Sequence, residues 1–195
     1  MRTLVACLVV CALLGACGGK KAAVTTTTGA PSWALAPNQV KRMQAAGITP
    51  LSAEGSVVHY HAHLDVFYNG EPKTVPAFVG IDVSAQRISP VHTHTDSGVI
   101  HIEANKDDTF TLGQFLQEWG VEVKGNCVAG KCGSQVAIYF NGVKQAGSVS
   151  DAKIHPDMEI ALVLGTPPAS IPSTNDCSKR SDDACPSQGS LFGGD

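Results

Sequence analysis

Histidines that recur at every second residue set the strongest constraint on how this chain folds. Six of its seven histidines lie in two short segments, with His59, His61 and His63 in the first and His92, His94 and His101 in the second. Side chains two residues apart share one face of a β-strand, because successive residues alternate across the pleat. Each segment is therefore expected to be a strand with imidazoles along one face, an arrangement typical of a metal site.

Strand patterns dominate the rest of the chain as well. Asn69-Gly70 and Asn141-Gly142 are strong signals for tight hairpins, because both central residues of a type I′ turn need positive φ. A further turn is expected at 95–98. Alternating or apolar runs predict strands over 57–68, 74–81, 87–94, 99–104, 135–140 and 159–164.

Two helices are expected beside these strands. One apolar stripe at helical spacing consists of Leu112, Phe115, Leu116 and Trp119. Thr111 suits the N-cap of this helix and Gly120 its C-terminal end. A shorter helix is expected over 37–46, with Pro37 in its first turn and Gly47 after its end. The predicted fold class is α+β and mainly β: a small antiparallel sheet or barrel-like domain with the amphipathic helix 112–119 and a short N-terminal helix.

Strand geometry limits how the histidines can share an ion. The Cα atoms of His59 and His63 should lie about 13 Å apart on a strand, whereas an imidazole nitrogen binds a metal at about 2 Å. Two of the three histidines in the first segment are therefore expected to bind one ion, and the third to orient a ligand, serve a second ion or pack. Such a pair with His92 and His94, or with His101, would complete a site of three or four histidines.

Asp65 and Glu103 share these strand faces. Each is a candidate extra ligand, or an acceptor for the distal ring N–H of a ligand histidine. The expected cofactor is a divalent transition metal, with zinc or copper first and iron, nickel or manganese as alternatives. No Cys or Met lies near the cluster, which argues against a blue-copper or Cu(I) thioether site. The alternatives to a metal site are histidines that pack or hydrogen-bond without an ion, and a pH sensor. His155 is interpreted as a surface residue.

The N-terminus has the pattern of an export signal. An apolar run over 4–14 follows Arg2 and is too short to anchor a chain across a bilayer. The run ends in Leu14-Gly15-Ala16-Cys17, which resembles the lipobox of bacterial lipoproteins. This resemblance implies a signal peptide over 1–16, a lipid on Cys17 and a flexible tether over 17–32. An ordinary secretory signal with an incidental cysteine is the alternative. In the first case the protein is exported and anchored to a bacterial membrane.

Four cysteines follow the tether, namely Cys127, Cys132, Cys177 and Cys185. An even count in an oxidising compartment predicts two disulfides, with three connectivities open. The local pairs Cys127–Cys132 and Cys177–Cys185 are favoured, because each pair brackets a short loop rich in small or polar residues. A thiolate metal site or a redox pair at Cys127 and Cys132 is the alternative, although their spacing exceeds the C-x-x-C pattern.

Charge and length bound the remaining choices. The formal net charge is −3 and the chain contains no run of Lys and Arg, so nucleic acid is not an expected partner. The expected partners are a metal ion and, through the lipid, a membrane; a protein partner cannot be named. The length suits one core, expected over 33–172, followed by a partly disordered tail over 173–195 that contains a disulfide.

Three motifs resemble those of a family of uncharacterised bacterial exported proteins. They are His-x-His-x-His-Leu-x-Val, His-Thr-His-x-x-Ser-Gly-x-Ile-His-Ile-Glu and Phe-Thr-Leu-Gly-Gln-Phe-x-x-Glu-Trp-Gly. The likeness covers residues 47–172 and supports the interpretation of this stretch as one domain. The His-x-His pairs are also similar to those of cupins and alpha-class carbonic anhydrases. However, the chain lacks the second cupin motif and is short for such an anhydrase, so this likeness concerns ligand geometry alone.

These observations favour an extracytoplasmic, lipid-anchored protein that binds a divalent metal for acquisition, buffering or delivery. The first alternative is a small cupin-like metalloenzyme, a hydrolase or an oxygenase, with the same histidine ligands and Glu103 as base. The second is a structural or interaction module in which the metal staples the fold. The sequence leaves enzymatic activity open, since it contains no Gly-x-Ser-x-Gly, dinucleotide, phosphate-loop or His-Glu-x-x-His motif that would single out a catalytic residue.

Overall fold

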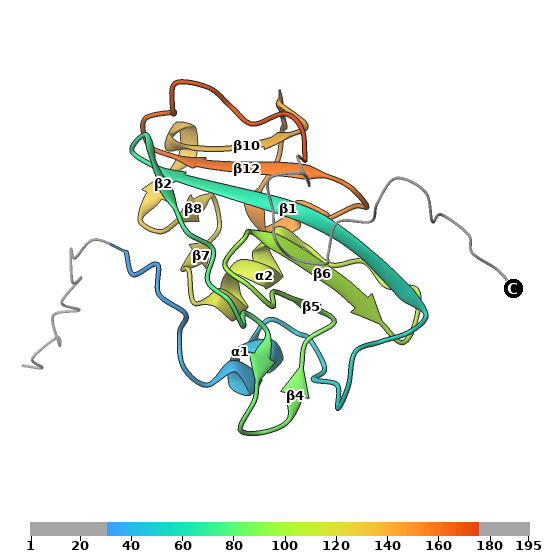
Figure 1. Ribbon diagram of the computed structural model, residues 1–195. Coiled ribbons are helices and arrows are strands. Elements are labelled where there is room, and N and C mark those ends of the chain that lie inside the picture. The colour runs from blue at the N-terminus through green and yellow to red at the C-terminus, as the bar shows by residue number, and fades with distance from the viewer. Residues whose placement is uncertain (1–30, 176–195) are drawn as a thin grey trace, which may run out of the picture. The chain divides into compact units, whose positions relative to one another are not determined.

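An eleven-residue strand, β1 (Val58–Tyr68), lies in the middle of the main sheet (Figure 1). The computed structural model describes residues 31–175, and all elements given below belong to this part. The other strands of the sheet are β2 (Glu71–Lys73), β5 (Val91–His92), β6 (Val99–Ala104), β10 (Val136–Phe140), β11 (Val143–Lys144) and β12 (Glu159–Leu164). Their order is β11-β10-β12-β1-β6-β5, and β2 also pairs with β1.

The two halves of β1 have different partners. The first half pairs with antiparallel β6 from Val58 to His63, and the second half pairs with parallel β12 from His63 to Tyr68. The strand β2 returns along the end of β1 after the turn at Asn69-Gly70, where φ is 53° and 87°. The remaining ladders of the sheet are antiparallel. The prediction of a mainly antiparallel β fold is therefore confirmed, with one parallel pair and with an open sheet in place of a barrel.

The helix α2 (Leu112–Trp119) confirms the prediction made from the apolar stripe. The Thr111 side chain accepts a hydrogen bond from the Gln114 N–H, and the Gln114 side chain accepts one from the Thr111 N–H, which is a capping box. Gly120 ends the helix at φ 103°. The helix α1 (Gln39–Ala45) is a shorter form of the helix expected over 37–46. No helix among residues 31–175 has the length and apolarity that a membrane crossing requires.

The hydrophobic core lies between one face of the sheet and α2 (Figure 1). Its main members are Ala62 and Leu64 of β1, Ile100 and Ile102 of β6, Ile160 and Leu162 of β12, and Phe115, Leu116 and Trp119 of α2. All of them are at most 1% exposed. Because side chains alternate across the pleat, burying this face turns the histidines of β1, β5 and β6 to the opposite face.

Two strand predictions are wrong in extent. The strand expected over 74–81 is absent over 74–80, and the partner of β1 is the earlier β2, because Pro76 lacks a ladder donor and Phe78 adopts a left-handed φ of 65°. The strand expected over 87–94 is divided at Pro90. Its first part, β4 (Arg87–Ile88), pairs with β3 (Ile81–Asp82), and its second part is β5. The strands predicted over 135–140 and 159–164 are confirmed as β10 and β12.

A third, three-stranded sheet carries two of the cysteines. It consists of β7 (Val123–Lys124), β8 (Cys127–Val128) and β9 (Lys131–Cys132), and the two short 3-10 turns of the fold are η1 (Gly133–Gln135) and η2 (Val149–Asp151). The disulfide predicted between Cys127 and Cys132 is present and joins directly opposite residues of β8 and β9. A thiolate site at this pair is not compatible with that bond.

Several predictions concern residues outside the part that the structure describes. They are the signal peptide over 1–16, most of the tether over 17–32, the lipid on Cys17, the Cys177–Cys185 disulfide and most of the tail over 173–195. The exposed position of His155, in contrast, is described and confirmed.

Candidate metal centre

The ladders of the main sheet line up histidines from three strands. His61 of β1 is directly opposite His101 of β6, and His101 is directly opposite His92 of β5. His59 of β1 is opposite Glu103 of β6 in the same way. The two sequence segments therefore meet on one face of the sheet. The expected site, with histidines of both segments on one ion, is not among the candidate ligand groups of the described residues, because none of these groups combines a histidine of the first segment with one of the second.

One group of ligand atoms among the described residues has four members, His92, His94, His101 and Glu103, which we call the inner site. Each residue offers one ligand atom, and these atoms all lie within 4.8 Å of one another. The Nε2 atoms of His92 and His94 are 3.1 Å apart, and Nδ1 of His101 is 3.3 Å from Oε1 of Glu103. Two ligands about 2.0–2.1 Å from a tetrahedral metal lie about 3.3 Å apart, so these separations suit a shared ion.

The tautomer of His92 leaves one ring nitrogen available for a metal. Its Nδ1–H donates to the Ser89 carbonyl oxygen at 2.8 Å, so Nε2 keeps its lone pair. His92 is fully buried. Burial and the neighbouring His94 lower the pKa of His92 to about 3. The ring is therefore neutral at physiological pH, which is the form that binds metals.

The inner site includes the carboxyl group of Glu103, whose pKa lies near neutral pH. Burial, together with the neighbouring Glu54 carboxyl, raises the pKa of Glu103 to about 7. Glu54 also lies 3.3 Å from Nε2 of His94. Its position depends on Gly55, because a Cβ at Gly55 would overlap the backbone of Ala104 in β6. This close approach brings the carboxyl of a preceding loop to the edge of the site.

A second group, which we call the outer site, consists of His59, His61 and Glu103. The Nε2 atoms of His59 and His61 are 3.3 Å apart, and Nε2 of His59 is 3.4 Å from Oε1 of Glu103. The ring of His61 contacts that of His101 with centroids 4.5 Å apart. Glu103 therefore belongs to both sites.

His63 lies apart from the other histidines of β1. Its Nδ1 is 2.9–3.0 Å from both carboxyl oxygens of Glu159 in β12, and its Nε2 is 3.0 Å from the Ser97 carbonyl oxygen. Asp65 is 3.8 Å from the same Nδ1. These three side chains also offer ligand atoms within 4.8 Å of one another. Because both ring nitrogens of His63 already face oxygen acceptors, hydrogen bonding accounts for this group without an ion.

The sequence did not single out three groups that complete these arrangements. Glu159 begins the last strand, and its only signal was a charged residue at the start of an otherwise apolar run. Glu54 reaches the site from a loop and had no periodic signal. The Ser89 carbonyl oxygen belongs to the backbone, so no residue type could reveal it.

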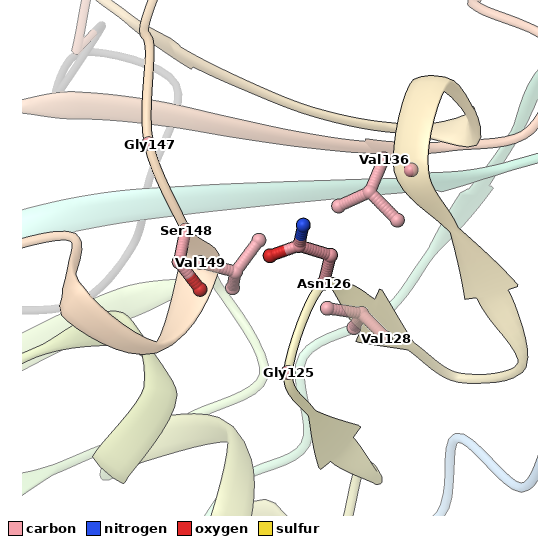
Figure 2. A pocket seen from close by; sticks show the side chains of 8 residues that line it. Gly125, Asn126, Val128, Val136, Gly147, Ser148 and Val149 are labelled. Carbon is pink, nitrogen blue, oxygen red and sulfur yellow. The ribbon is translucent and has the colours of Figure 1, made fainter.

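A separate hollow is lined by residues of a different kind from those of the two sites. It has a volume of about 400 Å³ and lies between the β8–β9 hairpin and η2 (Figure 2). Its polar side chains are Asn126 and Ser148, and the rest of its lining is valine and glycine. None of these residues titrates near neutral pH or is a strong metal ligand, so the inner and outer sites carry the chemistry that can be assigned.

Comparison with known proteins does not indicate a function, so the function is inferred from the site. No protein-family model, no curated protein and no solved structure matches this chain. The site itself contains histidine and glutamate clusters that could hold a metal ion. Neutral imidazole suits zinc, copper, nickel and iron, and a carboxylate can complete the ligand set of any of them.

Proposed function

We propose that this protein binds a divalent transition metal, zinc or copper(II), at the inner site and acts outside the cytoplasm in acquisition, buffering or delivery of that ion. The observation that carries the proposal is the convergence of His92, His94, His101 and Glu103 within 4.8 Å. Ser89 holds His92 in the metal-binding tautomer before any ion arrives, which is the outer-shell support that metal sites use.

Exposure supports exchange of the ion with solvent. The side chains of His92 and Glu103 are buried, whereas those of His94 and Glu54 are 39% and 51% exposed. An ion at the inner site is thus covered on one side and reachable on the other. A protein that acquires or delivers a metal needs such a path, because the ion must enter and leave without unfolding the sheet.

Metal content tests the proposal. Untagged full-length protein, purified in detergent from cells grown in rich medium, should contain at least one zinc or copper ion per chain by elemental mass spectrometry. The variant His92→Ala/His94→Ala should lose most of it. His155→Ala is the matched control, because His155 is exposed and outside both sites. Protein with all histidines intact that binds no divalent metal at micromolar concentration would overturn the proposal.

We also propose that a lipid on Cys17 holds the protein at a bacterial membrane. The lipobox-like Leu14-Gly15-Ala16-Cys17 supports this, and so does the disulfide Cys127–Cys132, which is typical of an oxidising compartment. The variant Cys17→Ser should leave the membrane fraction on cell fractionation. A variant that stays there contradicts lipid anchoring and leaves the metal proposal standing.

The open flank of the inner site favours a second candidate function, that of a small metalloenzyme. A water molecule on a metal at this flank would have a lowered pKa and could act as a nucleophile. Metal-dependent cleavage of activated esters or phosphate esters, lost in His92→Ala/His94→Ala, would support an enzyme over a carrier. Activity that persists in the metal-free protein would contradict it.

A further inference from the structure

We propose that the outer site takes a second metal ion beside the first, with the Glu103 carboxylate bridging the two ions. This inference rests on the proposed function, because it needs the inner site to hold a metal. It assigns a role to His59 and His61, which the inner site does not use.

The position of Glu103 carries the bridge. Its Oε1 atom is 3.3 Å from Nδ1 of His101 and 3.4 Å from Nε2 of His59. These two histidines lie on different strands and belong to different sites. A carboxylate has two oxygens and about four lone-pair positions, so one glutamate can serve two ions at once.

The histidine pair of the outer site has the separation of two ligands on one ion. The 3.3 Å between Nε2 of His59 and Nε2 of His61 equals the distance expected for neighbouring ligands on a tetrahedral metal, about 3.3 Å. The inner pair, His92 and His94, shows nearly the same separation of 3.1 Å. The sheet therefore presents two His-x-His pairs, each spaced for its own ion.

One ion could not collect all of these ligands. The ligand atoms of the outer and inner sites form two groups, each within 4.8 Å, that share Glu103. The two groups meet at the His61–His101 pair, whose rings lie edge to face across neighbouring strands with centroids 4.5 Å apart. Neighbouring strands are about 4.8 Å apart, and bridged metal pairs are about 3.5–4 Å apart. The two ions of a bridged pair would therefore lie about 1 Å closer together than the strands that supply their ligands.

The negative charge of two glutamates beside the histidines suits the binding of two cations. Glu103 is buried between the two sites, and Glu54 lies beside it, 3.3 Å from Nε2 of His94. Two carboxylates near the histidines supply negative charge that two divalent cations would balance.

Stoichiometry tests the second ion. Metal-free full-length protein titrated calorimetrically with Cu²⁺ should saturate at about two ions per chain, and His59→Ala/His61→Ala at about one. His155→Ala should keep two. Saturation of the wild type at one ion overturns the second site while the proposed function stands, and saturation at none overturns both.

Electron paramagnetic resonance tests the bridge on the wild-type protein, so it does not depend on the folding of a variant. Two bridged Cu²⁺ ions couple magnetically, and the integrated spin should fall clearly below the copper content when the second ion binds. Wild-type protein loaded with one Cu²⁺ should show one spin per copper. Two full spins per chain at two bound ions would show that Glu103 does not bridge them.

Discussion

His61 and His101 face each other directly across the β1–β6 ladder, with ring centroids 4.5 Å apart and an interplanar angle of 82°. The neighbouring position of the same ladder pairs Ala62 with Ile100, and both of these are fully buried in the core. A shift of β1 by one residue against β6 would turn the histidines of β1 into the core and the apolar side chains of β1 outward. The core therefore sets the register that assembles the two sites.

Metal affinity should depend on pH through Glu103. Its pKa of about 7 means that the carboxyl is protonated below that pH, and a metal must then displace the proton. Affinity should fall by up to about tenfold per unit as pH drops below 7 through this group alone. Glu103→Gln should bind about tenfold or more weakly at pH 8 and lose part of that slope. Titrations at pH 5.5 to 8 check this, with the exposed Glu122→Gln as control. Identical slopes in wild type and Glu103→Gln would contradict the assignment.

Stability should fall with rising pH through Glu118, a fully buried residue of α2. Burial raises the pKa of Glu118 to about 8, against an opposing effect of the Ser89 hydroxyl. An unfolded chain has a glutamate pKa of about 4.3. Between these values the native chain binds the extra proton, so this group lowers the free energy of unfolding by up to about 1.4 kcal/mol per pH unit.

Glu118→Gln should remove that dependence. Its advantage over the wild type should grow steadily from pH 5 to pH 8 in urea unfolding, and Glu122→Gln, exposed on the segment after α2, should show no such trend. Parallel curves for wild type and Glu118→Gln would mean that the buried carboxyl titrates normally.

Gly98→Ala should destabilise the loop that covers His63. Gly98 has φ 87°, and a Cβ there would lie 2.6 Å from Nε2 of His63 and 2.7 Å from the Leu64 carbonyl oxygen. Left-handed strain and overlap together should cost about 2–4 kcal/mol in the free energy of unfolding. Gly133→Ala is the control, because Gly133 has φ 58° and its Cβ would meet nothing within 4 Å. Equal losses in the two variants would show that the contact with His63 is unimportant.

Replacing both cysteines of the β8–β9 hairpin should lower stability and leave metal binding intact. Cys127→Ser/Cys132→Ser opens a short loop, with an expected loss of about 2 kcal/mol in the free energy of unfolding. The hairpin belongs to a sheet separate from the strands of both sites, so the number of bound ions should not change. Loss of an ion in this variant would show that the hairpin supports one of the two sites.

Local periodicity was sufficient to predict much of this molecule. Alternation placed the histidines of β1 on one face, and the reach of an imidazole predicted that only two of the three would share an ion. The structure shows that His63 is the one set apart. The stripe of α2 with the Thr111 cap, and the two Asn-Gly turns, followed from rules that act within a few residues. These signals depend only on the backbone geometry of each element.

The features that the sequence did not predict depend on contacts between distant segments. The parallel pairing of β1 with β12 brings Glu159 to His63 over 96 positions of sequence, and no local pattern encodes it. The strand expected over 74–81 was wrong because the left-handed Phe78 cannot be inferred from residue preferences. Glu54 reaches the centre because Gly55 packs against Ala104, which is a property of the folded chain.

In β1 and β6 the core residues lie on one face and the metal-ligand candidates on the other. The ligands can therefore be changed independently of the core. Side chains at 59, 61, 101 and 103 take no part in the hydrophobic core, while their neighbours in sequence supply it. Exchanging imidazole for thiolate or carboxylate at these four positions should alter metal preference without repacking the interior. A library confined to one face of the sheet could therefore retune selectivity while the fold stays constant.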